Sequence, residues 1–182
     1  MSKDEEYLIA MSKDGSYRSQ KKLYEMHSGM VWSICLRYLG NHEDAQDAFQ
    51  NAFITVFKKI DDYQGKGEFG AWVRKIAVNA ALMFYRSNRK SRLYVELDDV
   101  GVLSSNEDGI LDQLSAEDLM KAIKELPDGY RVVFNMYAVE GYSHAEIAEV
   151  LNISESTSRS QFSRARKLLM QFVNIESAKV NG

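Results

Sequence analysis

A stretch near the C-terminus carries side chains of the type and spacing that bind DNA. At helical steps of about 100°, one side of residues 154–172 is apolar and comprises Phe162, Ala165, Leu169 and Phe172. The opposite side holds cations and hydroxyl groups and no acid: Ser156, Arg159, Ser160, Ser163, Arg164 and Lys167. Arginine can form paired hydrogen bonds to a guanine edge or a phosphate, and serine adds short ones. The pattern favours a helix that lies in a DNA groove, and an ordinary solvated helix with a basic face is the alternative.

The residues just before this face predict a first helix and a tight turn. Ser143 followed three residues later by Glu146 is a capping box, which marks the start of a helix. Asn152 tolerates the left-handed backbone of a sharp turn, and Ser154 can cap the helix that follows. His144 lies within the capping-box turn, where we expect it to be solvated. Together these features predict a helix-turn-helix whose second helix binds DNA.

The charge of the chain is unevenly distributed. Its net charge of -3 argues against nucleic acid as a partner, but the basic residues gather in two separate places. One is the DNA-facing helix, and the other is the cluster Arg86, Arg89, Lys90 and Arg92. Residues 93–118, which lie between the two, contain eight acids and no Lys or Arg. Because salt screens charges beyond about 10 Å, the local charge decides binding and the sum does not.

The composition limits the class of protein. A chain of 182 residues with one proline and eleven glycines suits a mostly helical fold of one or two domains. His27, His42 and His144 are scattered, with no metal-ligand spacing or nucleophile pairing, so we expect no enzyme, no metal and no cofactor. The single cysteine, Cys35, shares helical spacing with apolar neighbours and is expected in the core. No segment resembles a signal peptide or a membrane span, which predicts a cytoplasmic protein.

Apolar periodicity divides the chain into two small all-α domains. Three segments in the first half have helical spacing: 21–39, 42–60 and 69–88. The acidic residues after them lack periodicity, which is typical of a flexible linker. The predicted boundaries are a first domain at 1–92, an acidic linker at 93–114 and a second domain, with the helix-turn-helix, at 115–182.

The same periodicity predicts which side chains face inward. In the helix at 69–88 these are Trp72, Val73, Ile76, Ala77 and Ala80. In the second domain, a helix that starts at Pro127 is expected to bury Val132, Val133, Met136 and Tyr137. We expect these two sets to contribute to two separate cores.

With both domains placed, the chain resembles a bacterial RNA polymerase sigma factor of the extracytoplasmic-function (ECF) group of the sigma-70 family. The second domain matches the family's pattern in LPDGYRVVFNMYAVEGYSHAEIAEVLNISESTSRSQFSRAR. The first domain is similar to the family's polymerase-binding helix in EDAQDAFQNAFITVFKKI and to its promoter-melting helix in FGAWVRKIAVNAA. These segments in this order, with an acidic linker between them, are much more specific than either alone. The resemblance implies a promoter-specificity subunit of RNA polymerase.

The resemblance also implies contacts for the first domain. The polymerase-binding positions of the family, which meet the β′ clamp helices, correspond to Asp47, Gln50, Asn51 and Phe53. At Asn51 the family usually has an acid. The segment that recognises the minus-ten element and melts promoter DNA supplies Lys66, Phe69, Trp72, Asn79, Arg86, Arg89 and Lys90. There, Trp72 is expected to support a pocket for an unstacked base and Asn79 to read a base edge, while the cations hold phosphates.

For the second domain, the resemblance implies contact with the minus-thirty-five element through Ser156, Arg159, Ser160, Ser163, Arg164 and Lys167. Ser158 departs from the family, which usually has an apolar residue at that inward position. The implied partners are core RNA polymerase, through its β′ clamp helices and β flap, promoter DNA, and an anti-sigma factor that can be membrane-anchored.

Another class of protein would account for part of the chain. A free-standing helix-turn-helix transcriptional regulator explains residues 143–167 equally well. It does not explain the helix with Asp47, Gln50 and Phe53, nor the segment that resembles a promoter-melting helix. Binding to purified core polymerase distinguishes the two hypotheses.

Overall fold

The computed structural model describes residues 2–89 and 116–180, and every regular element in these two ranges is a helix. The prediction of an all-α fold is therefore confirmed for the described residues. The predicted acidic linker at 93–114 and Lys90 lie outside them. The chain divides into two compact units, Met1–Ser87 and Asn88–Gly182. Among the described helices, none combines the length and the apolar character needed to cross a membrane.

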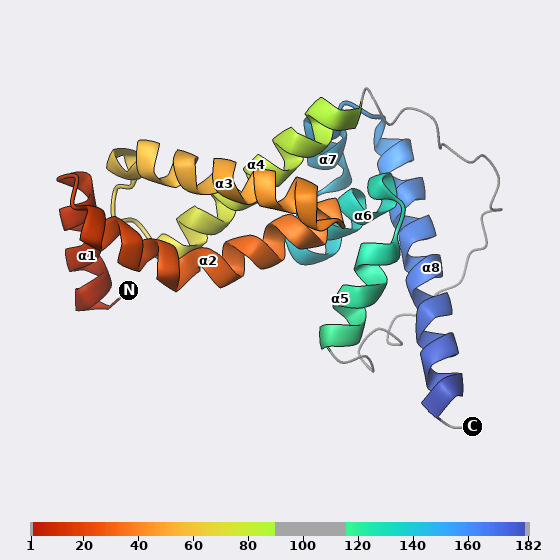
Figure 1. Ribbon diagram of the computed structural model, residues 1–182. Coiled ribbons are helices and arrows are strands. Elements are labelled where there is room, and N and C mark those ends of the chain that lie inside the picture. The colour runs from red at the N-terminus through yellow and green to blue at the C-terminus, as the bar shows by residue number, and fades with distance from the viewer. Residues whose placement is uncertain (1, 90–115, 181–182) are drawn as a thin grey trace. The chain divides into compact units, whose positions relative to one another are not determined.

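The first unit is built on the long helix α2, which packs against both α1 and α3 (Figure 1). Its elements are α1 (Lys3–Lys13), α2 (Tyr17–Leu39), α3 (His42–Lys58), the 3-10 turn η1 (Ile60–Asp62) and α4 (Phe69–Arg89). The sharp turn between α2 and α3 depends on Gly40, whose φ of 77° is in the left-handed region that glycine favours. Asn41 then caps α3, because its side chain accepts a hydrogen bond from the Asp44 backbone N–H at 2.9 Å.

The core of the first unit is formed mainly by α2, α3 and α4. Among its fully buried side chains are Leu23, Val31, Tyr38, Val56 and Val73. Cys35 is also buried, as predicted, and this burial raises the pKa of its thiol to about 12. At neutral pH the thiol therefore stays protonated and behaves as a small apolar group.

The inward face of α4 differs from the prediction. Trp72, Ile76 and Ala80 are only partly buried. The helix instead buries Val73, Ala77, Val78, Ala81 and Leu82. α4 is apolar over a wide arc, so its own sequence permits more than one inward face. Close packing of the small side chains against the neighbouring helices selects the observed one.

The second unit is organised around α8, which packs against α5, α6 and α7. Its elements are α5 (Ala116–Glu125), α6 (Asp128–Phe134), the π-helical turn η3 (Asn135–Val139), α7 (His144–Leu151) and α8 (Glu155–Val180). One cluster of its core consists of Ala122, Ile123, Leu126, Phe134, Ala165 and Leu169. Met136 is buried as predicted, whereas Tyr137 is partly exposed. The π-helical turn widens the helix and shifts the positions that follow, which explains this difference.

Candidate nucleic-acid interface

Local hydrogen bonds fix the turn between α7 and α8. Ser143 Oγ accepts from the Glu146 N–H at 3.2 Å, and the Glu146 carboxylate accepts from the Ser143 N–H at 2.8 Å. The Ser143 hydroxyl also donates to this carboxylate at 2.7 Å, and the two donors lower the pKa of Glu146, the backbone N–H contributing most. Asn152 follows with a φ of 53°, and Ser154 Oγ accepts from the Thr157 N–H at 3.0 Å. The predicted capping box, left-handed turn and second cap are all confirmed.

The outer face of α8 carries the six polar side chains that the sequence placed there. Ser156, Arg159 and Ser163 are exposed, while Ser160, Arg164 and Lys167 are partly buried. The expectation of an acid-free face is wrong, because Glu155 lies one turn before Arg159 and forms an ion pair with its guanidinium. Arg164 is also within reach of a partner, the Tyr130 hydroxyl, at 3.4 Å. Any DNA contact by Arg159 therefore competes with a pair inside the protein.

A buried polar pair lies behind this face. His144 is only 8% exposed, so the expectation that it is solvated is wrong. Its Nδ1 atom lies 2.9 Å from Ser158 Oγ, and its ring stacks on Tyr137 with centroids 4.3 Å apart. Burial lowers the pKa of His144, the positive charge of Arg159 lowers it further, and Glu155 partly opposes this. The signal in the sequence was Ser158, which places a hydroxyl at an inward position where the family usually has an apolar residue.

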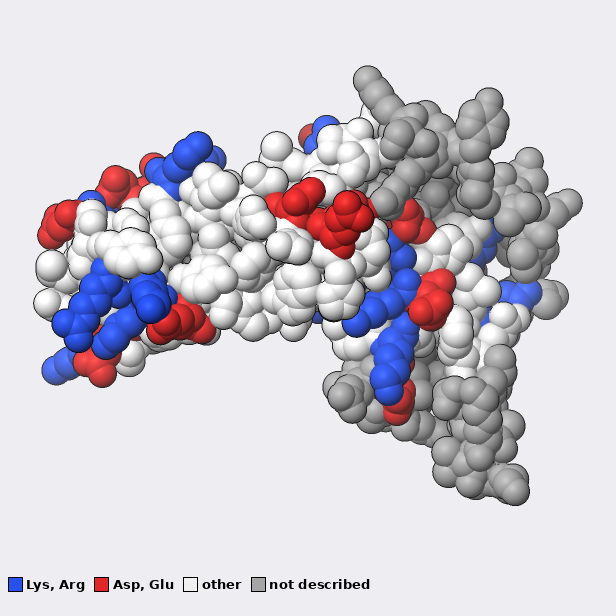
Figure 2. All heavy atoms as spheres, viewed as in Figure 1, with Lys and Arg blue, Asp and Glu red and all other residues white. Residues whose placement is uncertain are grey.

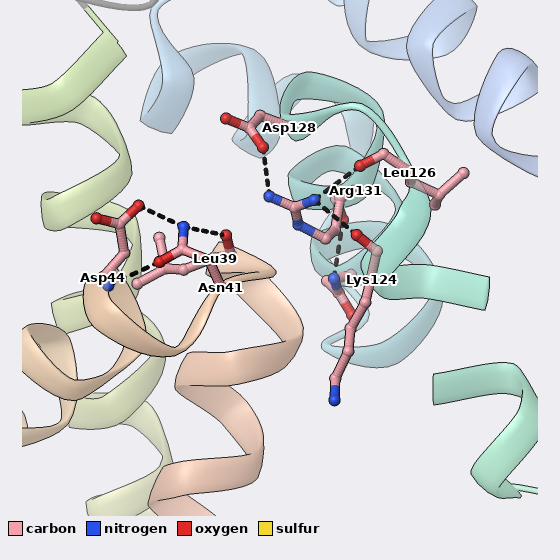
Figure 3. Close-up of polar contacts among 8 residues, drawn as sticks. Leu39, Asn41, Asp44, Lys124, Leu126, Asp128 and Arg131 are labelled. Atoms are coloured by element: carbon pink, nitrogen blue, oxygen red, sulfur yellow. Dashed lines mark hydrogen bonds and ion pairs between the residues drawn. The ribbon is translucent and has the colours of Figure 1, made fainter. Parts of the chain in front are cut away.

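Arg131 joins the start of the second unit to its core (Figure 3). Its side chain is only 5% exposed, and Nη1 donates to the carbonyls of Lys124 at 3.1 Å and Leu126 at 2.7 Å. Nη2 donates to the Asp128 carboxylate. The guanidinium thus satisfies carbonyl groups at the C-terminal end of α5, where the helix has no N–H donors of its own. The arrangement orients α5 against α6, on which α8 packs.

In the first unit, the loop between η1 and α4 rests on a cluster of aromatic rings. The ring centroids of Tyr63 and Phe69 are 5.1 Å apart, and Trp72 lies 5.6 Å from Tyr63 and 5.4 Å from Phe69. Phe69 is fully buried, so its assignment as a DNA contact is wrong, and its ring supports the loop from inside. Lys66 is exposed at the loop tip, between Gly65 and Gly67.

A line of exposed side chains continues from this loop along α4. Lys75, Asn79, Met83 and Arg86 follow one another at helical spacing, and all four are exposed. The arrangement offers an amide for a base edge, cations for phosphates and, in Met83, a thioether side chain that is 69% exposed. Arg89 is the last residue of α4. The sequence had not suggested a role for Met83.

One face of α3 has the character of a protein-binding surface. Asp47, Gln50 and Asn51 are exposed on it, and Figure 2 shows acidic side chains gathered near the N-terminal end of α3. Phe53 is only 7% exposed and packs on Tyr24 at 4.6 Å, so its assignment to the contact surface is corrected to a support for the helix. Ile54 was missed, although it lies seven residues after Asp47 on the same face and is 51% exposed.

Comparison with known proteins identifies both units. The family described as Sigma-70 region 2 matches residues 23–91, and the family described as Sigma-70, region 4 matches residues 116–169. The chain is 30% identical to the ECF RNA polymerase sigma factor SigE of Mycolicibacterium smegmatis, over 88% of this chain and 64% of that protein. It is 26% identical to the ECF RNA polymerase sigma factor SigW of Bacillus subtilis, over 88% of this chain and 92% of that protein.

The chain also aligns with a solved structure. It is the sigma factor RpoE of Bartonella quintana in complex with the anti-sigma factor NepR, with 20% identity and a TM-score of 0.48. The alignment covers 85% of this chain and 96% of the RpoE chain.

Proposed function

The chain belongs to the extracytoplasmic-function group of the sigma-70 family, and from this premise we propose how its two units divide the work of starting transcription. As an alternative sigma factor, the chain binds core RNA polymerase and directs it to chosen promoters. The first unit holds the polymerase through α3 and opens DNA at the minus-ten element with its loop and α4. The second unit recognises the minus-thirty-five element through α8. Both are binding roles, in which this chain makes and breaks no covalent bond.

One observation carries the proposal: two sigma-70 regions match in their proper order, and each contains an exposed surface with suitable chemistry. On α8 this surface consists of arginines and serines that can bind base edges and phosphates. On α4 it combines Asn79 with flanking cations. A free-standing regulator is not favoured, because it has no need of the region 2 segment.

Promoter opening without ATP requires the protein to bind bases once they have left the stack. Unstacking costs roughly a few kcal/mol, which contacts to the extruded base must offset. The exposed loop around Lys66 brings backbone and a cation near the strand, and Asn79 offers hydrogen bonds to a base edge. Arg86 and Arg89, with Lys90, hold nearby phosphates in this proposal. The aromatic cluster of Tyr63, Phe69 and Trp72 supports the site from beneath.

Three partners follow from the proposal. Core RNA polymerase contacts α3 through its β′ clamp helices and the second unit through its β flap, and promoter DNA contacts both units. The third partner is an anti-sigma factor, which can be membrane-anchored, because members of this group are commonly held inactive in that way. Work on the chromosome with polymerase requires the chain to act in the cytoplasm.

The direct test is run-off transcription with purified core RNA polymerase on fragments of genomic DNA. We expect the full chain to start transcripts at sites that the core enzyme alone does not use. If it starts none, yet protects an operator from cleavage without polymerase, the chain is a conventional repressor or activator.

A charge reversal tests the polymerase contact separately. Asp47→Arg places a cation on the exposed face of α3, and we expect it to weaken competition for core polymerase by about tenfold or more. Glu25→Arg is a matched reversal at an exposed position on α2 and should leave competition unchanged. Equal competition by both variants would remove α3 from the interface.

A further inference from the structure

Helix α1 makes long-range contacts that converge on the loop between η1 and α4. Glu5 Oε1 lies 3.2 Å from His27 Nε2, and these side chains are only 10% and 12% exposed. The His27 ring in turn lies 5.4 Å from Phe69, at the start of α4. One end of the loop is therefore tied through α2 to the first helix of the chain.

The other end of the loop is tied to α1 directly. Lys13 Nζ donates a hydrogen bond to the backbone carbonyl of Tyr63 at 2.8 Å, across fifty residues of sequence. The hydroxyl of Tyr63 then donates to the backbone carbonyl of Gly67 at 2.7 Å. Tyr63 thus links α1 to the far side of the loop, and Lys66 lies within the segment that these two bonds hold.

The loop needs these contacts with α1 because its own sequence does not restrict it to one conformation. Gly65 and Gly67 have φ values of 72° and 82°, and neither Cβ position has a neighbour within 4 Å. Glycine in an open loop has many accessible conformations, and this freedom must be lost before the loop can bind a strand in one shape. Hydrogen bonds made in the free protein remove part of that freedom in advance.

The chemistry of Tyr63 suits a permanent donor. Its ring is buried against Phe69 and Trp72, and burial raises the pKa of its hydroxyl, with a further rise from the charges of Glu5, Glu68 and Glu6. The hydroxyl is therefore protonated at neutral pH and able to donate to Gly67. Lys13 is itself exposed, so replacing its ammonium group should not disturb the core.

We propose that Lys13 and Tyr63 are positioning residues, through which α1 holds the loop at residues 64–68 in the shape that receives an unpaired promoter base. This inference rests on the proposed function of the first unit. Neither residue touches the base in this mechanism. Each lowers the barrier to opening because the loop is already ordered when the strand separates.

The test uses Tyr63→Phe and Lys13→Met in the full chain with core polymerase. Tyr63→Phe keeps the buried ring and removes the hydroxyl, and Lys13→Met keeps most of the side chain and removes the donor. On a duplex promoter found by the run-off assay, we expect open complexes to form about threefold to tenfold more slowly, the effect of losing one hydrogen bond. A template with an unpaired minus-ten segment should restore the wild-type rate.

Three controls make the result specific. Tyr17→Phe and Lys21→Met remove the same groups from exposed positions on α2 and should behave as wild type. Lys13→Arg keeps a donor and should recover much of the rate. Wild-type rates in Tyr63→Phe and Lys13→Met on the duplex would overturn the inference, and so would equal losses on duplex and unpaired templates.

Hydrogen exchange of the free chain separates this inference from the proposed function. We expect the amides of residues 64–68 to exchange several-fold faster in both variants than in the wild type. Unchanged exchange means that α1 does not hold the loop, even if the chain initiates transcription. Faster exchange in a chain that initiates at no promoter would support the tie to α1 and refute the proposed function.

Discussion

The two candidate DNA surfaces are built in different ways. The turn and most of the outer face of α8 depend on bonds between residues two to four positions apart, such as Ser143 with Glu146 and Ser154 with Thr157. Arg164, which reaches the Tyr130 hydroxyl, is the exception. The loop before α4 depends on bonds that span the unit, from Lys13 to Tyr63 and from Glu5 to His27. A surface of the first kind is encoded in a short segment. A surface of the second kind exists only when the surrounding helices are packed.

This difference predicts different effects of mutation. Changes on the outer face of α8 should weaken promoter binding while leaving the stability of the unit unchanged, because these side chains lie outside the core. Changes around the loop should affect promoter opening more than binding. Arg131 and His144 are the exceptions in the second unit, because both are buried and connect helices.

The largest effect is expected from Arg131→Met, which tests how far the second unit depends on a single buried contact. The change leaves the carbonyls of Lys124 and Leu126 without their guanidinium donor. We expect the free energy of unfolding to fall by about 2–4 kcal/mol, measured by urea denaturation of the full chain. Lys121→Met removes an exposed cation from α5 and should cost almost nothing.

Alanine at Arg159 or Arg164 tests whether side chains on the outer face of α8 can be removed without loss of stability. Each change should weaken binding of the holoenzyme to promoter DNA by about 1–3 kcal/mol if the side chain touches a base edge. Thermal unfolding should be unchanged, because neither residue belongs to the core. Lys121→Ala is the matched loss of one charge elsewhere in the unit. Unaltered promoter selectivity in both arginine variants would remove α8 from recognition.

Asn79→Ala tests whether a change on the DNA-facing side of the first unit affects promoter opening more than promoter binding. The residue is exposed on α4, so the fold should tolerate the change. We expect open-complex formation to slow by about threefold to tenfold, the effect of one lost hydrogen bond, with little effect on the initial binding of duplex DNA. A template that is already unpaired at the minus-ten segment should restore the rate. An equal defect in initial binding would assign Asn79 to the closed complex instead.

Glu155→Gln should produce a smaller effect of the opposite sign. Glu155 forms an exposed ion pair with Arg159, and such pairs contribute about 0.2–1 kcal/mol. Removing its charge frees the guanidinium for DNA and should tighten promoter binding by up to about fivefold, most clearly at low salt. Glu149→Gln removes an acid from an exposed position on α7 and serves as the control. If promoter binding is no tighter than in Glu149→Gln, the guanidinium of Arg159 makes no further DNA contact when its ion pair is removed.

The smallest effect is the pH dependence that His144 confers on stability. Its pKa is lowered from 6.5 in the folded chain, mainly by burial, so the unfolded chain binds the proton more readily. The contribution of neutral His144 to stability is therefore fully present above the pKa that this residue has in the unfolded chain, and it is lost as the pH falls below that pKa. His144→Gln should show a smaller fall in the free energy of unfolding between pH 7 and 5 than the wild type. His42→Gln, at an exposed position, should behave as the wild type.

Features that depend on a few neighbouring residues could be predicted from the sequence. The capping box at Ser143, the left-handed Asn152 and the burial of Cys35 are examples, because each follows from local geometry or composition. The helices and the outer face of α8 also follow from periodicity. The assignment of individual side chains to DNA or polymerase remains a prediction.

The errors concern residues whose environment is made by distant parts of the chain. Phe69 and Phe53 were placed on binding surfaces but are buried, because other helices cover them. His144 was expected in solvent, yet Ser158 and the ring of Tyr137 enclose it. Periodicity gives the spacing of side chains along a helix, but it does not show which neighbouring helix covers each one.

The burial of Cys35 has a practical consequence. Because its thiol is enclosed and remains protonated, it should react slowly with maleimide reagents. Cysteines introduced at one exposed position in each unit can therefore be labelled with a pair of fluorescent dyes without first replacing Cys35. Energy transfer between the dyes would then follow the separation of the two units as the chain joins the polymerase and as the promoter opens.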